Sequence, residues 1–315
     1  MINRRSFITG IKSTKLSLKE KNFLRKYKPW GVILFSRNIK NIKQTFKLTS
    51  TIRKIFNDKK YPILVDQEGG RVNRLKNIIS FDNLTSEFFG NQYVRNYREF
   101  KFFYRLFVDK TSYLLKSLGI NVNTVPVLDL RYKNTSKIIG DRSFSNDPKI
   151  VSKIGDYCIQ YFHENSIGTI MKHIPGHGLA KVDSHHFTPL VNKDQIFLIK
   201  KDFVPFKNKK TFFAMTAHII FNKIDNRNTV THSKKLIKLI RNKIGFKNIL
   251  ISDDLSMKSL KGTIKENTIK TFNAGCNLAL HCNGNFKEME IVGKNSPLIN
   301  KFIYKKTSQF LKILS

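Results

Sequence analysis

Short apolar runs alternate with longer amphipathic runs along almost the whole chain. Eight of the short runs are nearly continuous in Ile, Val, Leu or Phe, as strands that are buried on both faces must be. We therefore expect strands at 6–11, 31–36, 62–66, 120–126, 168–173, 211–218, 248–253 and 277–281.

Between these runs, apolar residues recur at the spacing that is typical of amphipathic helices. This spacing predicts helices at 17–27, 42–56, 99–118, 148–165, 233–244 and 265–274, and a closing helix at 297–314 on the outside of the domain. Ser17 and Glu20 resemble a capping box, and Gly119 and Gly245 stand where glycines commonly end helices.

Eight strands that alternate with helices over 315 residues predict an α/β fold, a (β/α)8 TIM barrel. A doubly wound open sheet is the alternative. No linker or shift in composition divides the chain, so we expect one catalytic domain over 1–315.

Composition favours a globular protein, because 40% of the residues are hydrophobic. No uncharged apolar run is long enough to span a bilayer, and the first residues contain no apolar segment of signal-peptide length. We therefore expect a cytoplasmic protein with no membrane partner. Cys158, Cys276 and Cys282 are too few and too scattered for a disulfide framework, and they form no C-x-x-C zinc motif.

The charge is strongly positive, with 58 Lys and Arg against 22 Asp and Glu and a net charge of +36. Such a charge raises the possibility of nucleic-acid binding. The basic residues are spread along the chain, however, and no nucleic-acid-binding motif is present. We expect no specific nucleic-acid partner, although a basic nucleic-acid-binding protein stays the alternative from another functional class.

Acidic residues are scarce, yet several follow predicted strands directly. In a barrel, these positions lie at the C-terminal face, where catalytic groups are found. For any single aspartate the competing interpretation is a helix cap. The carboxylates in these positions are Asp66, Glu68, Asp129, Asp141, Asp183, Asp253 and Asp254.

The segment 171–186, "MKHIPGHGLAKVDSHH", holds four of the eight histidines, and its proline and glycines exclude a helix. It is expected to be a loop that presents polar groups. A metal site built from His173, His177, Asp183 and His185 is possible. Because two flexible glycines between the ligands would leave such a site poorly organised, we predict neither a metal nor a cofactor.

Five motifs in order resemble glycoside hydrolase family 3, most closely its single-domain bacterial β-N-acetylglucosaminidases. Each motif alone is a weak signal, and their order and spacing make the set specific. They are "DQEGGRVNR" (66–74), "IGDRSF" (139–144), "KHIPGHG" (172–178), "DSH" (183–185) and "SDDLSM" (252–257).

The resemblance implies that Asp253 is the nucleophile, which would form a covalent glycosyl-enzyme. It also implies that His185 is the acid/base and that Asp183 fixes the tautomer of its ring. We expect Asp254 to cap the helix that follows, and His186 has no matching role.

The resemblance further implies a set of sugar contacts, namely Asp66, Arg74, Arg142, Lys172 and His173. Glu68, Gly69 and Gly70 are expected to form the turn that aims Arg74, His177 to order its loop, and His218 to line the pocket. Two segments depart from the family pattern: "LAKV" (179–182) stands where relatives often have a polar residue and a threonine, and "NRNTV" (226–230) stands where relatives commonly have Pro-Ala.

The expected activity is that of a monomeric, retaining exo-β-N-acetylglucosaminidase. By resemblance, its small carbohydrate substrate would be an anhydro-muropeptide from peptidoglycan recycling. A phosphorylase of the same family is the alternative among enzymes, because a neutral histidine, unlike a carboxylate, does not repel phosphate.

Overall fold

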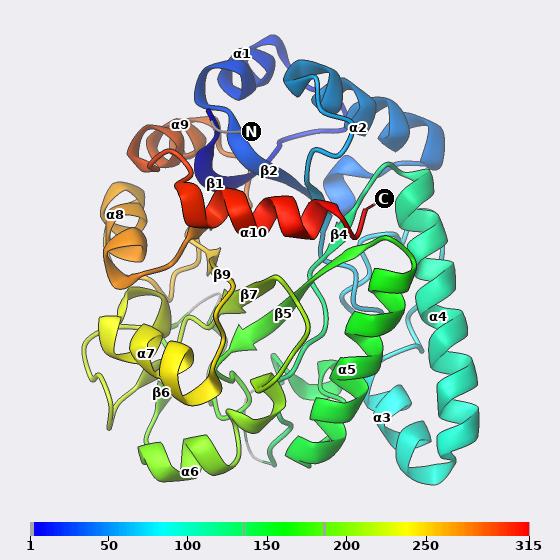
Figure 1. The fold of residues 1–315 in the computed structure, drawn as a ribbon, viewed down its shortest axis with the longest axis vertical. Coiled ribbons are helices and arrows are strands. Elements are labelled where there is room, and N and C mark those ends of the chain that lie inside the picture. The colour runs from blue at the N-terminus through cyan, green and yellow to red at the C-terminus, as the bar shows by residue number, and fades with distance from the viewer. Residues whose placement is uncertain (1–2, 134, 136, 185–186, 315) are drawn as a thin grey trace.

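The computed structural model describes residues 3–133, 135, 137–184 and 187–314. Eight parallel strands close into a barrel in the order β1-β10-β9-β7-β5-β4-β3-β2, and helices surround it (Figure 1). The predicted (β/α)8 barrel is therefore confirmed, and the open sheet is excluded. Each predicted strand overlaps one barrel strand: β1 (Arg5–Gly10), β2 (Pro29–Leu34), β3 (Ile63–Val65), β4 (Val122–Asn123), β5 (Gly168–Ile174), β7 (Phe213–Thr216), β9 (Ile249–Asp254) and β10 (Leu278–His281).

The six helices predicted between strands are present, with small shifts at their ends. They are α1 (Leu18–Tyr27), α2 (Ile42–Phe56), α4 (Tyr97–Ser117), α5 (Pro148–Glu164), α7 (Lys234–Leu239) and α8 (Ile264–Ala274). The α1 capping box is confirmed, since Ser17 Oγ accepts from the Glu20 N–H at 3.1 Å and Glu20 Oε2 accepts from the Ser17 N–H at 2.8 Å. After α7 the chain continues as a π-helix (Ile240–Ile244) that ends at Gly245, where φ is 82°.

Three helices were not predicted: α3 (Ser86–Arg95), α6 (Gln195–Lys200) and α9 (Phe286–Asn295). Helix α3 has a glycine in its interior, which lowers helix propensity. Gly90 is needed there because a Cβ atom would lie 1.6 Å from the carbonyl oxygen of Phe144. Short 3₁₀ helices occur at Ser36–Asn38, Gly140–Arg142, Val204–Phe206 and Val230–His232.

The closing helix α10 (Lys301–Leu311) differs from the prediction in its position. It crosses the N-terminal end of the barrel in front of the strands (Figure 1). Trp30 Nε1 donates to Thr307 Oγ1 at 2.9 Å, and the rings of Phe213 and Phe310 meet edge to face with centroids 4.9 Å apart. The helix therefore closes this end of the barrel interior instead of joining the outer ring, and the opposite end is left for the site.

A second, two-stranded parallel sheet pairs β6 (Leu190–Val191) with β8 (Ile220–Phe221). It anchors the chain that follows segment 171–186 to the loop after β7. Within the described ranges, no helix combines the length and the apolar character needed to cross a membrane.

Candidate active site

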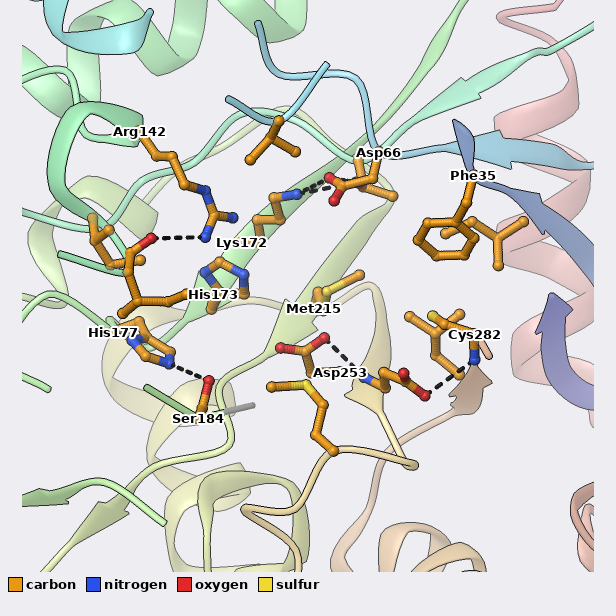
Figure 2. Close-up of a pocket in the computed structure, with 18 of the residues that line it drawn as sticks. Phe35, Asp66, Arg142, Lys172, His173, His177, Ser184, Met215, Asp253 and Cys282 are labelled. Carbon is orange, nitrogen blue, oxygen red and sulfur yellow. Dashed lines mark hydrogen bonds and ion pairs between the residues drawn. The ribbon is translucent and has the colours of Figure 1, made fainter. Parts of the chain in front are cut away.

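A cavity of about 450 Å³ opens at the C-terminal ends of the barrel strands (Figure 2). Six of the predicted site residues line it together: Asp66, Arg74, Arg142, Lys172, His173 and Asp253. Asp183 precedes Ser184, which also lines the cavity. The predicted acid/base His185 lies outside the described residues, as does His186.

Asp66 follows β3 and is surrounded by donors from three other segments. Its Oδ1 accepts from Thr124 Oγ1 at 2.7 Å and from Lys172 Nζ, and its Oδ2 accepts from Arg74 Nη2 at 2.9 Å. Burial alone would raise the pKa of Asp66, but the nearby charges, Lys172 first, hold it well below its usual value. Asp66 therefore faces the cavity as a carboxylate.

Glu68 lies in the predicted turn, and its side chain makes further contacts that were not expected. Gly69 and Gly70 do form a turn with positive φ values, 98° and 54°. The Glu68 side chain, however, is only 3% exposed and forms ion pairs with Arg142 and Lys172. The predicted turn is therefore present, and the contacts of the Glu68 side chain with Arg142 and Lys172 were not predicted.

The backbone of Arg74 is held by the side chain of Gln67. Gln67 Oε1 accepts from the Arg74 N–H at 2.8 Å, and the Gln67 N–H donates in turn to Asn123 Oδ1 at 3.0 Å. The Arg74 guanidinium lies 5.4 Å from the centroid of the Phe35 ring. Phe35 also lines the cavity and was not predicted as a site residue.

Asp129 connects the end of β5 to the loop that follows it. Its side chain is fully buried; Oδ2 accepts from His173 Nδ1 at 2.6 Å, and Oδ1 accepts from the His177 N–H at 2.6 Å. Burial would raise the pKa of Asp129, but the two histidines lower it. The carboxylate therefore holds the proton of His173 on Nδ1 and directs Nε2 away from Asp129.

His177 contributes to the order of its loop, as expected. Its Nε2 lies 3.1 Å from Ser184 Oγ, which connects the "GHG" and "DSH" motifs (Figure 2). Burial, followed by the charge of His173, lowers the pKa of His177 to about 4. The ring is therefore neutral at neutral pH. In the described ranges, no group of three His, Cys, Asp or Glu side chains could hold a metal ion.

Asp253 and Asp254 lie together at the end of β9. The Asp254 N–H donates to Asp253 Oδ1 at 2.8 Å, which fixes the rotamer of the predicted nucleophile. Asp254 Oδ1 accepts from the N–H groups of Ser256 and Cys282, both at 3.1 Å. The expected helix cap was wrong: Asp254 stabilises a turn and ties it to the end of β10, and Thr263 caps α8 instead.

His218 supports the site from below and is not among the described residues that line the cavity. It is fully buried, with Nδ1 at 2.8 Å from Thr231 Oγ1 and Nε2 at 3.1 Å from the Asp254 carbonyl oxygen. The expectation that it lines the pocket was wrong, because one ring nitrogen faces Thr231 in the 3₁₀ helix Val230–His232 and the other faces the carbonyl oxygen of Asp254 at the end of β9.

Sequence reasoning assigned no function to Asp129 or to the side chain of Glu68. Both residues carried a usable signal, since each is a carboxylate directly after a predicted strand in a chain with few carboxylates. Their partners come from other strand ends and could not be inferred from spacing.

Comparison with known proteins gives matches over most of the chain. Residues 6–306 match the N-terminal domain of glycosyl hydrolase family 3. A β-hexosaminidase from Actinobacillus pleuropneumoniae is 34% identical over 288 residues, which cover 88% of this chain and 80% of the relative. One from Haemophilus influenzae is 32% identical over 286 residues, covering 88% of this chain and 79% of the relative.

Solved structures of β-N-acetylglucosaminidases and of NagZ have the same fold as this chain. NagZ from Neisseria gonorrhoeae, determined in complex with N-trifluoroacetyl-D-glucosamine, superposes with a TM-score of 0.88 at 27% identity. That match covers 98% of this chain and 90% of NagZ. The β-N-acetylglucosaminidase from Thermotoga maritima gives a TM-score of 0.79 at 25% identity, covering 98% of this chain and 66% of that protein.

Proposed function

Because this chain belongs to glycosyl hydrolase family 3, we propose that it is a retaining exo-β-N-acetylglucosaminidase that uses Asp253 as its nucleophile. The chain is a glycoside hydrolase related to the β-hexosaminidases. The stereochemical course, the sugar and the roles of the individual residues are parts of the proposal.

The observation that carries the proposal is the placement of Asp253. Its carboxylate lines the cavity at the end of a barrel strand, opposite the group formed by Asp66 and Lys172 (Figure 2). The Asp254 N–H donates to Asp253 Oδ1 at 2.8 Å, which holds the carboxylate in one orientation. A nucleophile must be held rigidly at one face of the sugar, and a strand-end carboxylate with a fixed rotamer meets that requirement.

The residues opposite Asp253 can bind sugar hydroxyls. Asp66 supplies carboxylate oxygens, Arg74 and Arg142 supply guanidinium N–H groups, and His173 supplies the ring nitrogen that does not face Asp129. Bonds from these groups to the hydroxyls can strengthen as charge develops at the anomeric centre. We assign the terminal sugar to this part of the cavity.

His185 would protonate the departing oxygen and later deprotonate the incoming water, with Asp183 orienting its imidazole. Support comes from the motif and from the neighbouring contact of Ser184 with His177, which brings the start of the "DSH" segment to the cavity wall. A histidine suits both steps because its pKa lies near neutrality.

For the sugar, we propose N-acetylglucosamine, because NagZ is described in complex with N-trifluoroacetyl-D-glucosamine. As the natural substrate, we propose a peptidoglycan-derived anhydro-muropeptide, cleaved in the cytoplasm during cell-wall recycling by a monomeric, single-domain enzyme. This substrate rests on the resemblance to the bacterial β-N-acetylglucosaminidases.

Hydrolysis of a panel of aryl β-glycosides, with and without the N-acetyl group, tests the proposal. We expect 4-nitrophenyl N-acetyl-β-glucosaminide to be cleaved with β-N-acetylglucosamine as the first product, as seen by NMR. An α-configured first product would contradict retention. Formation of sugar 1-phosphate when phosphate is added would identify the phosphorylase instead.

A further inference from the structure

Glu68 is a buried carboxylate that takes no part in the proposed chemistry. It follows β3 by three residues, its side chain is 3% exposed, and it is not among the described residues that line the cavity. A buried charge is costly unless it is paired and hydrogen-bonded. Its partners therefore indicate what the carboxylate does.

Both partners of Glu68 are proposed sugar contacts. Arg142 binds it through two parallel bonds, from Nε to Oε2 at 2.7 Å and from Nη2 to Oε1 at 2.8 Å. Lys172 Nζ lies 2.6 Å from Oε1. One carboxylate thus holds a cation from strand β5 and a cation from the 3₁₀ helix Gly140–Arg142. Its two parallel bonds to Arg142 fix the plane of the guanidinium.

The bonds to Glu68 leave donors for a ligand on one of these cations. Arg142 uses Nε, one N–H of Nη2 and one N–H of Nη1, the last bonding the Ile138 carbonyl oxygen at 3.1 Å. A guanidinium has five N–H groups, so two remain. Glu68 therefore fixes Arg142, which lines the cavity, through bonds that use only part of its N–H groups.

The charge of the cavity gives Glu68 a second effect. The chain carries +36, and cationic side chains outnumber acidic ones along the described cavity wall. The charged residues of that wall are Arg71, Arg74, Arg142 and Lys172, with Asp66, Asp253 and Asp254. Without Glu68, Arg142 would lose the carboxylate that it pairs with, Lys172 would keep its ion pair with Asp66, and the cavity would attract small anions.

We propose that Glu68 is a positioning and specificity residue: it fixes Arg142 and Lys172 as hydrogen-bond donors for a neutral sugar and cancels charge that would otherwise draw inorganic anions into the site. The first half rests on the proposed function, since it takes both cations as sugar contacts. The second half depends only on the ion pairs. Glu68 acts through its partners and does not touch the sugar.

The test is Glu68→Gln, which keeps the size of the side chain and removes its charge. Sulfate binding is measured by calorimetry without substrate, and KM and kcat are measured on 4-nitrophenyl N-acetyl-β-glucosaminide. We expect sulfate to bind and inhibit at least about tenfold more tightly, because one unit of charge has been removed in a site of low dielectric. We expect KM to rise by about tenfold or more, with a smaller fall in kcat.

Glu68→Asp separates the two effects, because it keeps the charge and shortens the side chain by one methylene. We expect its sulfate affinity to be as weak as that of the parent, because the charge is kept. We expect its KM to be higher than that of the parent, because the shorter side chain no longer holds both cations. Glu164→Gln is the matched control, because it removes the same charge at an exposed position. Glu164 is the last residue of α5, its side chain is 42% exposed, and it pairs with Arg105 of α4. Parental sulfate affinity and KM are expected there.

A Glu68→Gln variant with parental KM and parental sulfate affinity would overturn the proposal. If that variant does not fold, Glu68→Asp decides, since a parental KM overturns the positioning and tighter sulfate binding overturns the charge effect. If the parent does not cleave the N-acetylglucosaminide, the proposed function fails. The calorimetric comparison still tests the charge effect in that case, because it needs no turnover.

Discussion

His173 and Asp129 form a buried pair in which Nδ1 of the histidine lies 2.6 Å from Oδ2 of the aspartate. The same carboxylate accepts from the His177 N–H at 2.6 Å, so it holds both ends of the turn around Gly176. We expect Asp129→Ala to lower the free energy of unfolding by about 3–5 kcal/mol, the usual cost of breaking a buried pair. Denaturant unfolding at pH 7 measures this cost.

The pH dependence of that cost follows from the lowered pKa of Asp129. A carboxyl group whose pKa is lower in the folded state stabilises the protein above its unfolded pKa, and the effect is lost as the pH falls through the folded pKa. The stability difference between the parent and Asp129→Asn should therefore be constant above about pH 5 and shrink in more acidic buffer. A difference that grows on acidification would contradict the pair.

His185 is predicted to supply general acid catalysis. Replacement by alanine should slow cleavage of natural disaccharides by about 100- to 10,000-fold, because their alkoxide leaving groups need a proton. For aryl glycosides with acidic phenols, the rate of the glycosylation step should fall much less, because the phenolate leaves without a proton. Asp183→Ala should show a milder form of the same pattern. His186→Ala is the matched control, and equal losses on all leaving groups in the His185 variant would exclude the assignment.

Asp202 lies beneath the same loop as a buried carboxyl group. Tyr132 Oη donates to its Oδ2 at 2.8 Å, and a Cβ atom on Gly176 would lie 3.1 Å from its Cβ. Burial raises its pKa to about 7, with Asp129 adding to the shift and the bond from Tyr132 opposing it. The folded state therefore favours the neutral carboxyl group, and stability is lost as the pH rises from the unfolded pKa through about 7.

Asp202→Asn should remove the loss of stability that accompanies ionisation of Asp202 as the pH rises. We expect the variant to gain stability relative to the parent between pH 4 and pH 8, by up to a few kcal/mol, since each pKa unit corresponds to about 1.4 kcal/mol. Thermal melts across this range measure the difference. Asp82→Asn, at an exposed aspartate, is the control. A difference that is independent of pH would show that Asp202 is already ionised in the folded protein.

The positive charge should have little effect on a neutral substrate. Cleavage of an aryl N-acetylglucosaminide should change little between 50 and 300 mM salt, on the order of twofold or less, because the bonds that hold the sugar are local. Binding to nucleic acid should weaken steeply over the same range. Sequence-selective binding that persists at high salt would favour the nucleic-acid alternative.

The eight strands and the strand-end carboxylates could be predicted from the sequence because burial on both faces leaves a clear pattern. The position of a helix relative to the barrel could not be predicted from the sequence. The apolar face of α10 shows that the helix packs against something, but its partner Trp30 is 277 residues away from Thr307 in the chain. Amphipathic spacing identifies a buried face and not the surface that covers it.

The same limit explains the errors at the site. Asp66 and Asp253 were found because family motifs mark them, and both line the cavity. The role of Glu68 depends on Arg142, which is 74 positions later in the chain. A strand-end residue such as His218 can face the cavity or the layer beneath it, and only the strand register decides which. Short elements such as α6 carry too few residues for a periodic signal.

Trapping the glycosyl-enzyme decides whether Asp253 forms a covalent bond to the sugar. The chain is incubated with a 5-fluoro N-acetylglucosaminyl fluoride, quenched, digested and analysed by tandem mass spectrometry. We expect one added sugar on the peptide containing 252–257, located on Asp253, and none in Asp253→Ala. A label on another carboxylate, or an unlabelled enzyme that still turns the reagent over, would contradict the role of Asp253.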